Sequence, residues 1–152
     1  MPGWLIHNGK FFQDDEMLLS ADNRSFRYGD GLFETLRLSE GRIPLWDLHQ
    51  QRLFQSLRVM GFEIPKLFTP DLLLHHTQAL IKKTNLTNAR VRITLYRGNG
   101  GLTDKTDQTP GYIIQLWAAE SGTVSLNIKR MCRLNSQFLL NPYSQRRKNI
   151  II

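Results

Sequence analysis

Hydrophobic and polar positions in the N-terminal part of the chain predict short β-strands, with a two-residue alternation over 32–38. Two short strands are expected within 4–12, because the Asn-Gly pair at 8–9 is a strong signal for a tight hairpin turn. Over 33–38, leucines alternate with Thr35 and Arg37, which predicts a strand with one buried face.

Two closely spaced glycines, Gly29 and Gly31, come just before this strand. Glycine has no Cβ and adopts backbone angles that other residues avoid, so the pair predicts a sharp bend. The bend places Tyr28 and Glu34 at the start of the strand, where binding residues often lie. A loop turn without any chemistry explains the same residues equally well.

The middle of the chain has the apolar spacing of helices. One helix is expected over 46–60, with an alternative start one residue earlier, and Gly61 suits its C-terminal end. A second is expected over 70–83, because Pro70 is favourable in a first helical turn and Asn85 suits the end. The apolar stripe of the second helix comprises Leu73, Thr77, Leu80 and Ile81.

Strand patterns then return. A strand with one buried face is expected over 89–96, a mostly apolar strand over 112–118, and a further alternating strand over 124–128. A glycine-rich loop at 98–101 follows the first of these. The order of strands, two helices and strands again predicts an α+β sandwich.

Composition limits the class of protein. The chain has 152 residues, enough for one domain with a sizeable core, and its 41% hydrophobic and 22% charged residues are typical of soluble globular proteins. It contains no apolar run of membrane-spanning length and no recognisable signal peptide. The single Cys132 excludes an internal disulfide and suits a reducing compartment, so we expect a cytoplasmic protein.

A net charge of +7 raises the possibility of nucleic-acid binding, because Lys and Arg gain binding energy by displacing phosphate counterions. Three basic residues bunch at 146–148, but most others are scattered among acidic residues. Basic and aromatic residues do not interleave as they do in single-strand binders. The distribution therefore disfavours a nucleic-acid partner.

Two arginines are candidates for binding an anion. The predicted helix places His49, Arg52 and Ser56 on one face, and the planar guanidinium of Arg52 suits a carboxylate or a phosphate. Arg97 ends a predicted strand beside the glycine-rich loop, where it could meet a small anion. Solvent-exposed side chains are the common alternative for both arginines.

Other kinds of catalytic site lack sequence support. The histidines are not spaced with Cys132 as zinc ligands would be, so no metal site is expected. There is no Gly-x-Ser-x-Gly nucleophile elbow, and the glycine-rich loop lacks the Gly-Lys-Ser/Thr of a phosphate-binding loop. A structural thiol is the favoured interpretation of Cys132.

Three segments taken together resemble the class IV aminotransferases, the fold-type-IV pyridoxal-phosphate (PLP) enzymes. They read Tyr-Gly-Asp-Gly-Leu-Phe-Glu-Thr at 28–35, His-Gln-Gln-Arg-Leu-Phe-Gln-Ser at 49–56 and Val-Arg-Ile-Thr-Leu-Tyr-Arg-Gly at 91–98. The similarity runs from about 4 to about 128, in the family's order and spacing. It implies the N-terminal α/β sandwich domain of that fold, with an antiparallel-rich sheet packed against two helices.

The resemblance also implies roles for individual residues. Arg52 matches the family's arginine that binds the cofactor phosphate, and Tyr28 matches a residue on the substrate side of the cofactor. Arg97 resembles a position that helps bind the substrate carboxylate in some members. His49 and Ser56 are expected to support Arg52, and the resemblance assigns no catalytic residue within this chain.

The family's chemistry uses PLP held by a lysine as a Schiff base, with the ring acting as an electron sink. The resemblance therefore implies either amino-group transfer from an amino acid to a 2-oxo acid or the related aminodeoxychorismate lyase reaction. The implied partners are small-molecule substrates and a second copy of the chain in a homodimer, with no nucleic acid or membrane. The substrate and its stereochemistry stay open.

The chain departs from the family pattern near its end. Family members continue into a second domain, whose lysine lies in a stretch similar to Ser-x-Leu-Lys-Ser/Thr-x-Asn-Tyr. The best match here is 136–143, which puts Leu139 in the lysine position, and Lys148 is only a weak candidate. We expect a family-like domain over 1–129 and a basic tail over 130–152 that is the start of the missing second domain.

Three explanations of this departure stay open. The chain could be a truncated or frame-shifted product with little or no activity, which is the favoured interpretation. It could be a non-catalytic binding domain derived from the family. A separate chain could also supply the second half, provided that it carries the lysine.

Overall fold

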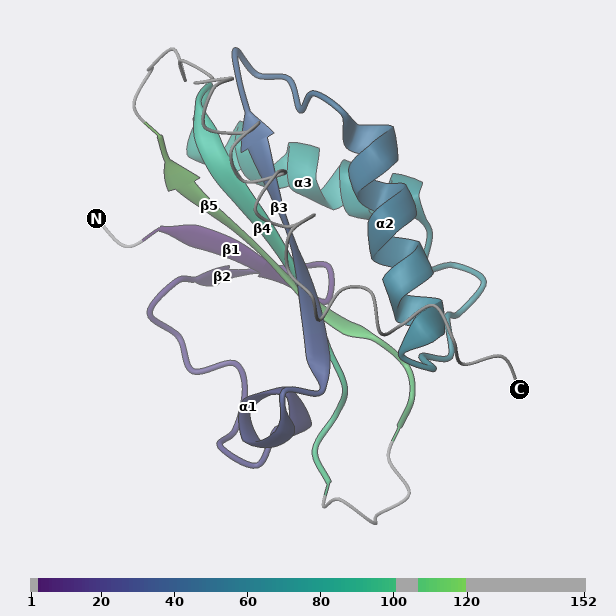
Figure 1. The fold of residues 1–152 in the computed structure, drawn as a ribbon. Helices are drawn as coiled ribbons and strands as arrows, with labels where there is room; N and C mark the ends of the chain where they lie inside the picture. The colour runs from purple at the N-terminus through teal and green to yellow at the C-terminus, as the bar shows by residue number, and fades with distance from the viewer. Residues whose placement is uncertain (1–2, 101–106, 120–152) are drawn as a thin grey trace, which may run out of the picture. The chain divides into compact units, whose positions relative to one another are not determined.

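A five-stranded antiparallel sheet forms the centre of the fold (Figure 1). The computed structural model describes residues 3–100 and 107–119. The strand order is β2-β1-β5-β4-β3, and every neighbouring pair is antiparallel. The strands are β1 (Trp4–His7), β2 (Lys10–Gln13), β3 (Gly31–Leu38), β4 (Ala89–Tyr96) and β5 (Gly111–Ala118).

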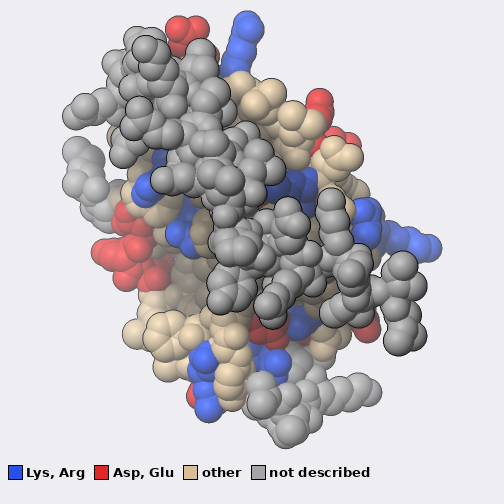
Figure 2. Space-filling model, viewed as in Figure 1, with Lys and Arg blue, Asp and Glu red and all other residues tan. Residues whose placement is uncertain are grey.

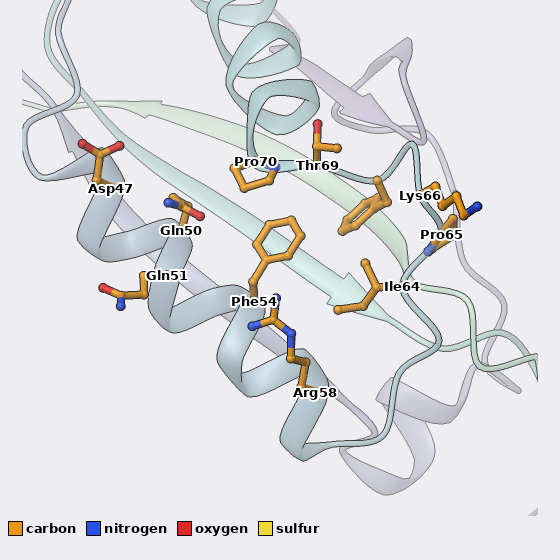
Figure 3. Close-up of a pocket in the computed structure, with 11 residues that line it drawn as sticks. Asp47, Gln50, Gln51, Phe54, Arg58, Ile64, Pro65, Lys66, Thr69 and Pro70 are labelled. Atoms are coloured by element: carbon orange, nitrogen blue, oxygen red, sulfur yellow. The ribbon is translucent and has the colours of Figure 1, made fainter.

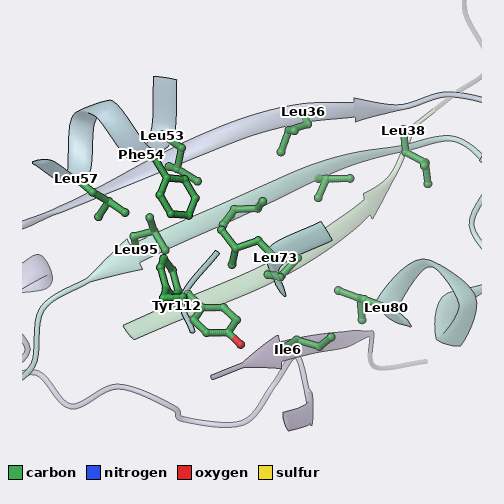
Figure 4. Close-up of a cluster of buried hydrophobic side chains, with 14 of the residues drawn as sticks. Ile6, Leu36, Leu38, Leu53, Phe54, Leu57, Leu73, Leu80, Leu95 and Tyr112 are labelled. Carbon is green, nitrogen blue, oxygen red and sulfur yellow. The ribbon is translucent and has the colours of Figure 1, made fainter. Parts of the chain in front are cut away.

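Two long helices, α2 (Trp46–Val59) and α3 (Pro70–Thr84), pack on the same face of the sheet. Their buried leucines, among them Leu57 and Leu80, share one core with the inward side chains of β3, β4 and β5 (Figure 4). Burial of each such side chain contributes about 1.5–3 kcal/mol. The α+β prediction, with an antiparallel sheet against two helices, is confirmed.

Local signals locate most of the elements correctly. Both residues of the β1–β2 turn have positive φ, 48° at Asn8 and 83° at Gly9, as a two-residue hairpin requires. Gly61 after α2 and Asn85 after α3 are left-handed, at 72° and 55°, as expected for residues that end helices. The strand expected over 124–128 and the domain boundary at 129 lie outside the described residues.

The glycine pair behaves differently from the prediction of one sharp bend. A five-residue helix, α1 (Arg24–Tyr28), precedes it, and only Gly29 is left-handed, with φ 67°. Gly31 is already the first residue of β3. A Cβ there would lie 2.8 Å from the carbonyl oxygen of Leu95, so glycine is needed for close packing. The sequence pattern missed α1 because that helix buries no residue and has no apolar stripe.

The described helices include none that is both long enough and apolar enough to span a membrane. On the face shown in Figure 2, basic and acidic side chains are interspersed over the part of the surface that is described. The described residues also hold no group of three or more histidine, cysteine or acidic side chains that could bind a metal ion.

Candidate functional site

The buried carboxylate of Glu34 is the centre of the best-defined polar cluster in the described part of the chain. Glu34 lies on β3 in the same phase as Leu36 and Leu38, so its side chain points towards α2 rather than towards solvent. Only 5% of Glu34 is exposed. A carboxylate at such a position needs partners that replace its lost hydration.

Arg52 and His49 from α2 supply those partners. Arg52 Nε donates to Glu34 Oε2 at 3.0 Å, and Arg52 Nη2 donates to Oε1. His49 Nδ1 lies 2.7 Å from the same Oε1. An ionised carboxylate can only accept, so Nδ1 carries the proton of the imidazole. Nδ1 also lies 3.5 Å from Arg52 Nη2, but a protonated Nδ1 cannot accept a hydrogen bond from it. The expected support of Arg52 by His49 therefore runs through Glu34. Within the described residues, Ser56 makes no side-chain hydrogen bond to Arg52.

Arg52 is anchored on one side and open on the other. Its side chain is 66% exposed, although two of its nitrogen atoms are held by a carboxylate that is almost fully buried. Its Nη1 makes no hydrogen bond within the described residues, so that edge of the guanidinium faces outwards. Hydrogen bonds to Glu34 raise the pKa of Arg52 above its usual value. The arginine is thus a permanent, oriented cation.

The pKa of Glu34 is lower than that of an ordinary glutamate. Burial alone would raise it, but the hydrogen bonds and positive charge of Arg52, together with His49, outweigh burial. A lowered pKa in the folded state stabilises the protein above the unfolded-state pKa, and this contribution is lost as the pH falls through the folded-state value.

We expect Glu34→Gln to destabilise the fold by about 1–2 kcal/mol at pH 7, because charge-assisted hydrogen bonds are lost. The difference should shrink as the pH falls below about 4.3, the usual pKa of glutamate, and should vanish only below the lowered folded-state pKa, since a protonated glutamate is neutral like glutamine. Urea unfolding of both proteins between pH 3 and pH 7 measures the difference. A gap that stays constant across this range would contradict a charge-dependent contribution.

Arg97, the residue directly after β4, is the centre of a second polar cluster. Its Nη1 donates to Asp30 Oδ1 at 2.7 Å, its Nη2 donates to the carbonyl of Met60, and its guanidinium lies 4.4 Å from the ring centroid of Phe62. Only 12% of the side chain is exposed. Arg97 is therefore not the exposed surface arginine that the alternative interpretation expected.

Asp30 joins Arg97 to the segment that carries Tyr28. Its second oxygen accepts from Arg24 Nε at 2.7 Å, and Arg24 and Arg27 lie 5.4 and 5.2 Å from the centroid of the Tyr28 ring. Tyr28 ends α1 and is 40% exposed. Asp30 thus forms ion pairs with both Arg24 and Arg97, and Arg24 lies against the Tyr28 ring. These contacts connect Tyr28 to Arg97. Their roles towards a substrate stay predictions.

The sequence pattern did not predict the ion pairs that Asp30 and Glu34 form with arginines. Both lie within the segment 28–35 that was singled out, but only the fold reveals their arginine partners, 67 and 18 positions away. An acidic residue in the apolar phase of a strand, as at Glu34, is the one local signal that could have suggested a buried partner.

The open hollow drawn in Figure 3 lies elsewhere. It is about 700 Å³ in volume and lies between α2 and the segment that leads into α3. Phe54 and Ile64 line it from the two sides, with Arg58 at its edge (Figure 3). Its lining includes neither Arg52, Tyr28 nor Arg97. The predicted site residues therefore belong to the two polar clusters rather than to this hollow.

Comparison with known proteins identifies relatives that match part of the chain. The aminodeoxychorismate lyase of Bacillus subtilis is 31% identical over 112 residues, which are 72% of this chain and 35% of that protein. A putative branched-chain-amino-acid aminotransferase of Methanocaldococcus jannaschii is 30% identical over 95 residues, which are 62% and 32%. The chain spans about a third of the length of these curated relatives.

Solved structures share the fold. The branched-chain amino acid aminotransferase from Escherichia coli matches with a TM-score of 0.70 and 22% identity, over 78% of this chain and 42% of that one. A hypothetical aminotransferase from Mycobacterium tuberculosis, in its PLP-bound form, matches with a TM-score of 0.61 and 27% identity, over 76% and 39%. The sheet and helices described above are thus the N-terminal domain of the branched-chain aminotransferase fold.

The family model for amino-transferase class IV matches residues 31–148, which include Glu34, Arg52 and Arg97. Members of this family are PLP-dependent aminotransferases or lyases. The match covers most of the sequence and agrees with the relatives and with the fold. The chain belongs to the class IV aminotransferases.

Proposed function

We propose that this chain forms the cofactor-phosphate side of a class IV aminotransferase or aminodeoxychorismate lyase, with Arg52 as the phosphate ligand. The observation that carries the proposal is the half-anchored guanidinium, whose Nε and Nη2 are held by Glu34 while Nη1 faces outwards. Guanidinium groups bind phosphate oxygens through charge-assisted hydrogen bonds.

The donors present suit the phosphate of PLP. Arg52 stays charged at any physiological pH, and its exposed edge can reach an anion without breaking the pair with Glu34. When bound, PLP supplies the electron sink for bond cleavage beside the substrate nitrogen. The task of Arg52 is to bind the phosphate and so to fix the ring relative to the sheet.

On the substrate side, we propose that Tyr28 lines the site and that Arg97 helps to bind the substrate carboxylate. Tyr28 is partly exposed at the end of α1, which leaves its ring accessible to a small molecule. Arg97 already pairs with Asp30, so a substrate carboxylate would share the guanidinium with that aspartate. Asp30 would then set the orientation of Arg97.

The proposed substrates are an amino acid and a 2-oxo acid, or an aminodeoxychorismate-like compound for the lyase reaction. Relatives of both kinds support this pair, because they include aminotransferases and aminodeoxychorismate lyases. A homodimer and a cytoplasmic location remain part of the proposal, the latter on the single cysteine.

Replacement of Arg52 tests the phosphate role. We expect Arg52→Ala to weaken binding of pyridoxamine 5′-phosphate by about tenfold or more, because the charge-assisted hydrogen bonds to the phosphate are lost. This probe cannot form an imine with surface lysines, so NMR titration reports only reversible binding. Arg58→Ala, which removes an exposed arginine six positions along α2, is the matched control and should change the affinity less than twofold. Equal effects of the two variants would refute the proposal.

We further propose that this chain alone has little or no transaminase activity, because Leu139 stands where the family's lysine is expected and leucine cannot form an imine. Residue 139 lies outside the described residues. After addition of PLP, an absorbance scan before and after borohydride treatment should reveal no lysine-linked band beyond that of a lysine-matched control protein. A stoichiometric band that borohydride abolishes would contradict this part of the proposal.

A further inference from the structure

We propose that Glu34 is a positioning residue that holds Arg52 in the orientation required for phosphate binding. This inference rests on the proposed function and adds to it a residue to which neither the sequence motifs nor the comparisons assign a role. The observation behind it is the contrast between a nearly inaccessible carboxylate and the exposed arginine that it holds.

The contacts fix the plane of the guanidinium. Glu34 accepts from Arg52 through both oxygens, Oε2 from Nε and Oε1 from Nη2, so the two planar groups meet edge to edge. Such a pair leaves Nη1 and the outer hydrogen of Nη2 as the remaining donors. These donors point away from Glu34, on a side chain that is 66% exposed.

The orientation of Glu34 is itself constrained. It lies on β3, which is hydrogen-bonded to β4, and its side chain is packed in the same row as the core residue Leu36. His49 Nδ1 donates to Oε1 at 2.7 Å and limits rotation of the carboxylate. Rigid elements on both sides, β3 and α2, therefore set the position of Arg52.

Pre-orientation matters because a free arginine is flexible. Ordering a long, rotamer-rich side chain on binding costs conformational entropy. In this fold Arg52 is ordered before the ligand binds, because Glu34 already holds it. Binding therefore does not include the cost of ordering this side chain. Glu34 also has an opposing effect, since its negative charge reduces the attraction of Arg52 for a phosphate. For Glu34 to strengthen phosphate binding overall, the gain in affinity from orientation must exceed this loss of electrostatic attraction.

Orientation and charge neutralisation change the affinity for phosphate in opposite directions. The direction of the affinity change in a Glu34 variant therefore shows which effect is larger. We expect Glu34→Gln to weaken binding of pyridoxamine 5′-phosphate about fivefold, while binding of pyridoxamine without the phosphate stays unchanged. If Glu34 mainly neutralised Arg52, the same substitution would strengthen phosphate binding. Tighter or unchanged binding by a folded Glu34→Gln protein would overturn the inference.

The Arg52 variant separates this inference from the proposed function. If Arg52→Ala leaves phosphate binding intact, the proposed function fails and so does the inference. If Arg52→Ala abolishes binding but Glu34→Gln binds as the unaltered protein does, only the positioning role fails. Glu34→Asp is the conservative comparison, because a carboxylate one methylene shorter retains the charge but cannot reach both nitrogens in the same geometry.

NMR of the unaltered chain tests the positioning role of Glu34 without any variant that could fold poorly. In arginine-labelled protein, the Nε–H resonance of Arg52 should be shifted from those of solvent-exposed arginines such as Arg58, and slow to exchange, because it donates to a buried carboxylate. Addition of pyridoxamine 5′-phosphate should shift this resonance without collapsing it. A resonance that is averaged with those of mobile arginines would contradict the positioning role.

Discussion

Asp30→Ala should destabilise the fold by about 3–5 kcal/mol, because it leaves the buried charges of two arginines without their shared carboxylate. Arg24 and Arg97 are 13% and 12% exposed, so water cannot replace Asp30 at either guanidinium without rearrangement. Thermal unfolding followed by circular dichroism should record a drop on the order of 10 °C.

Asp22→Ala is the matched control for this prediction. Asp22 also pairs with an arginine, Arg27, but at 3.4 Å and with 78% of its side chain exposed. Exposed ion pairs contribute at most about 1 kcal/mol, so this variant should unfold close to the unaltered protein. Similar losses in both variants would show that the burial of Asp30 does not account for its effect.

The pKa of Asp30 indicates how the cluster responds to acid. Burial would raise this pKa, but hydrogen bonds from Arg24 and Arg97 and their positive charges bring it below the usual value. The stabilisation is therefore present above the unfolded-state pKa and is lost in acid, as for Glu34. The two carboxylates give the domain two separate sources of acid sensitivity.

Gly31→Ala should destabilise the fold by about 1–3 kcal/mol, because the added Cβ is too close to its neighbours. A Cβ at this position would lie 2.8 Å from the carbonyl oxygen of Leu95 and 2.5 Å from Ser25 Oγ. The Ser25 hydroxyl can rotate only by giving up its 2.7 Å hydrogen bond to the carbonyl of Asp30. The backbone of β4 cannot move without disturbing its pairing with β3.

Gly98→Ala is the comparison variant, because nothing lies within 4 Å of the added Cβ and the backbone there is not left-handed. It should unfold at the same urea concentration as the unaltered chain, or at a slightly higher one. If Gly31→Ala behaves in the same way, the close approach between β3 and β4 is not a constraint on this segment.

Local chemistry was sufficient to predict most of the elements. Helix α2 follows from the spacing of its apolar residues and from Gly61, and α3 follows from Pro70 and Asn85, since each signal acts within a few residues. The β1–β2 hairpin follows from Asn8 and Gly9 for the same reason. Helix α1 escaped prediction because its ends are set by Asn23 and Gly29 without any apolar periodicity between them.

The candidate site was predictable only in part. Helical spacing puts His49 and Arg52 on one face of α2, and the family resemblance assigns a phosphate role to Arg52. Neither consideration identifies Glu34 as the group that orients Arg52, because that contact depends on the packing of α2 against β3. The role of Arg97 in joining Asp30 to the carbonyl of Met60 depends in the same way on tertiary structure.

By itself, the sequence determined the family, the α+β class and the bounds of the main elements, because these depend on periodicity, turn residues and short motifs. Only the tertiary structure decided that Glu34 holds Arg52 and that Asp30 joins Arg24 to Arg97. The pairs Glu34–Arg52 and Asp30–Arg97 join segments that are far apart in the sequence, and each is held in place by the burial of a carboxylate. Burial is a property of the packed sheet and helices, and no local pattern of residues specifies it.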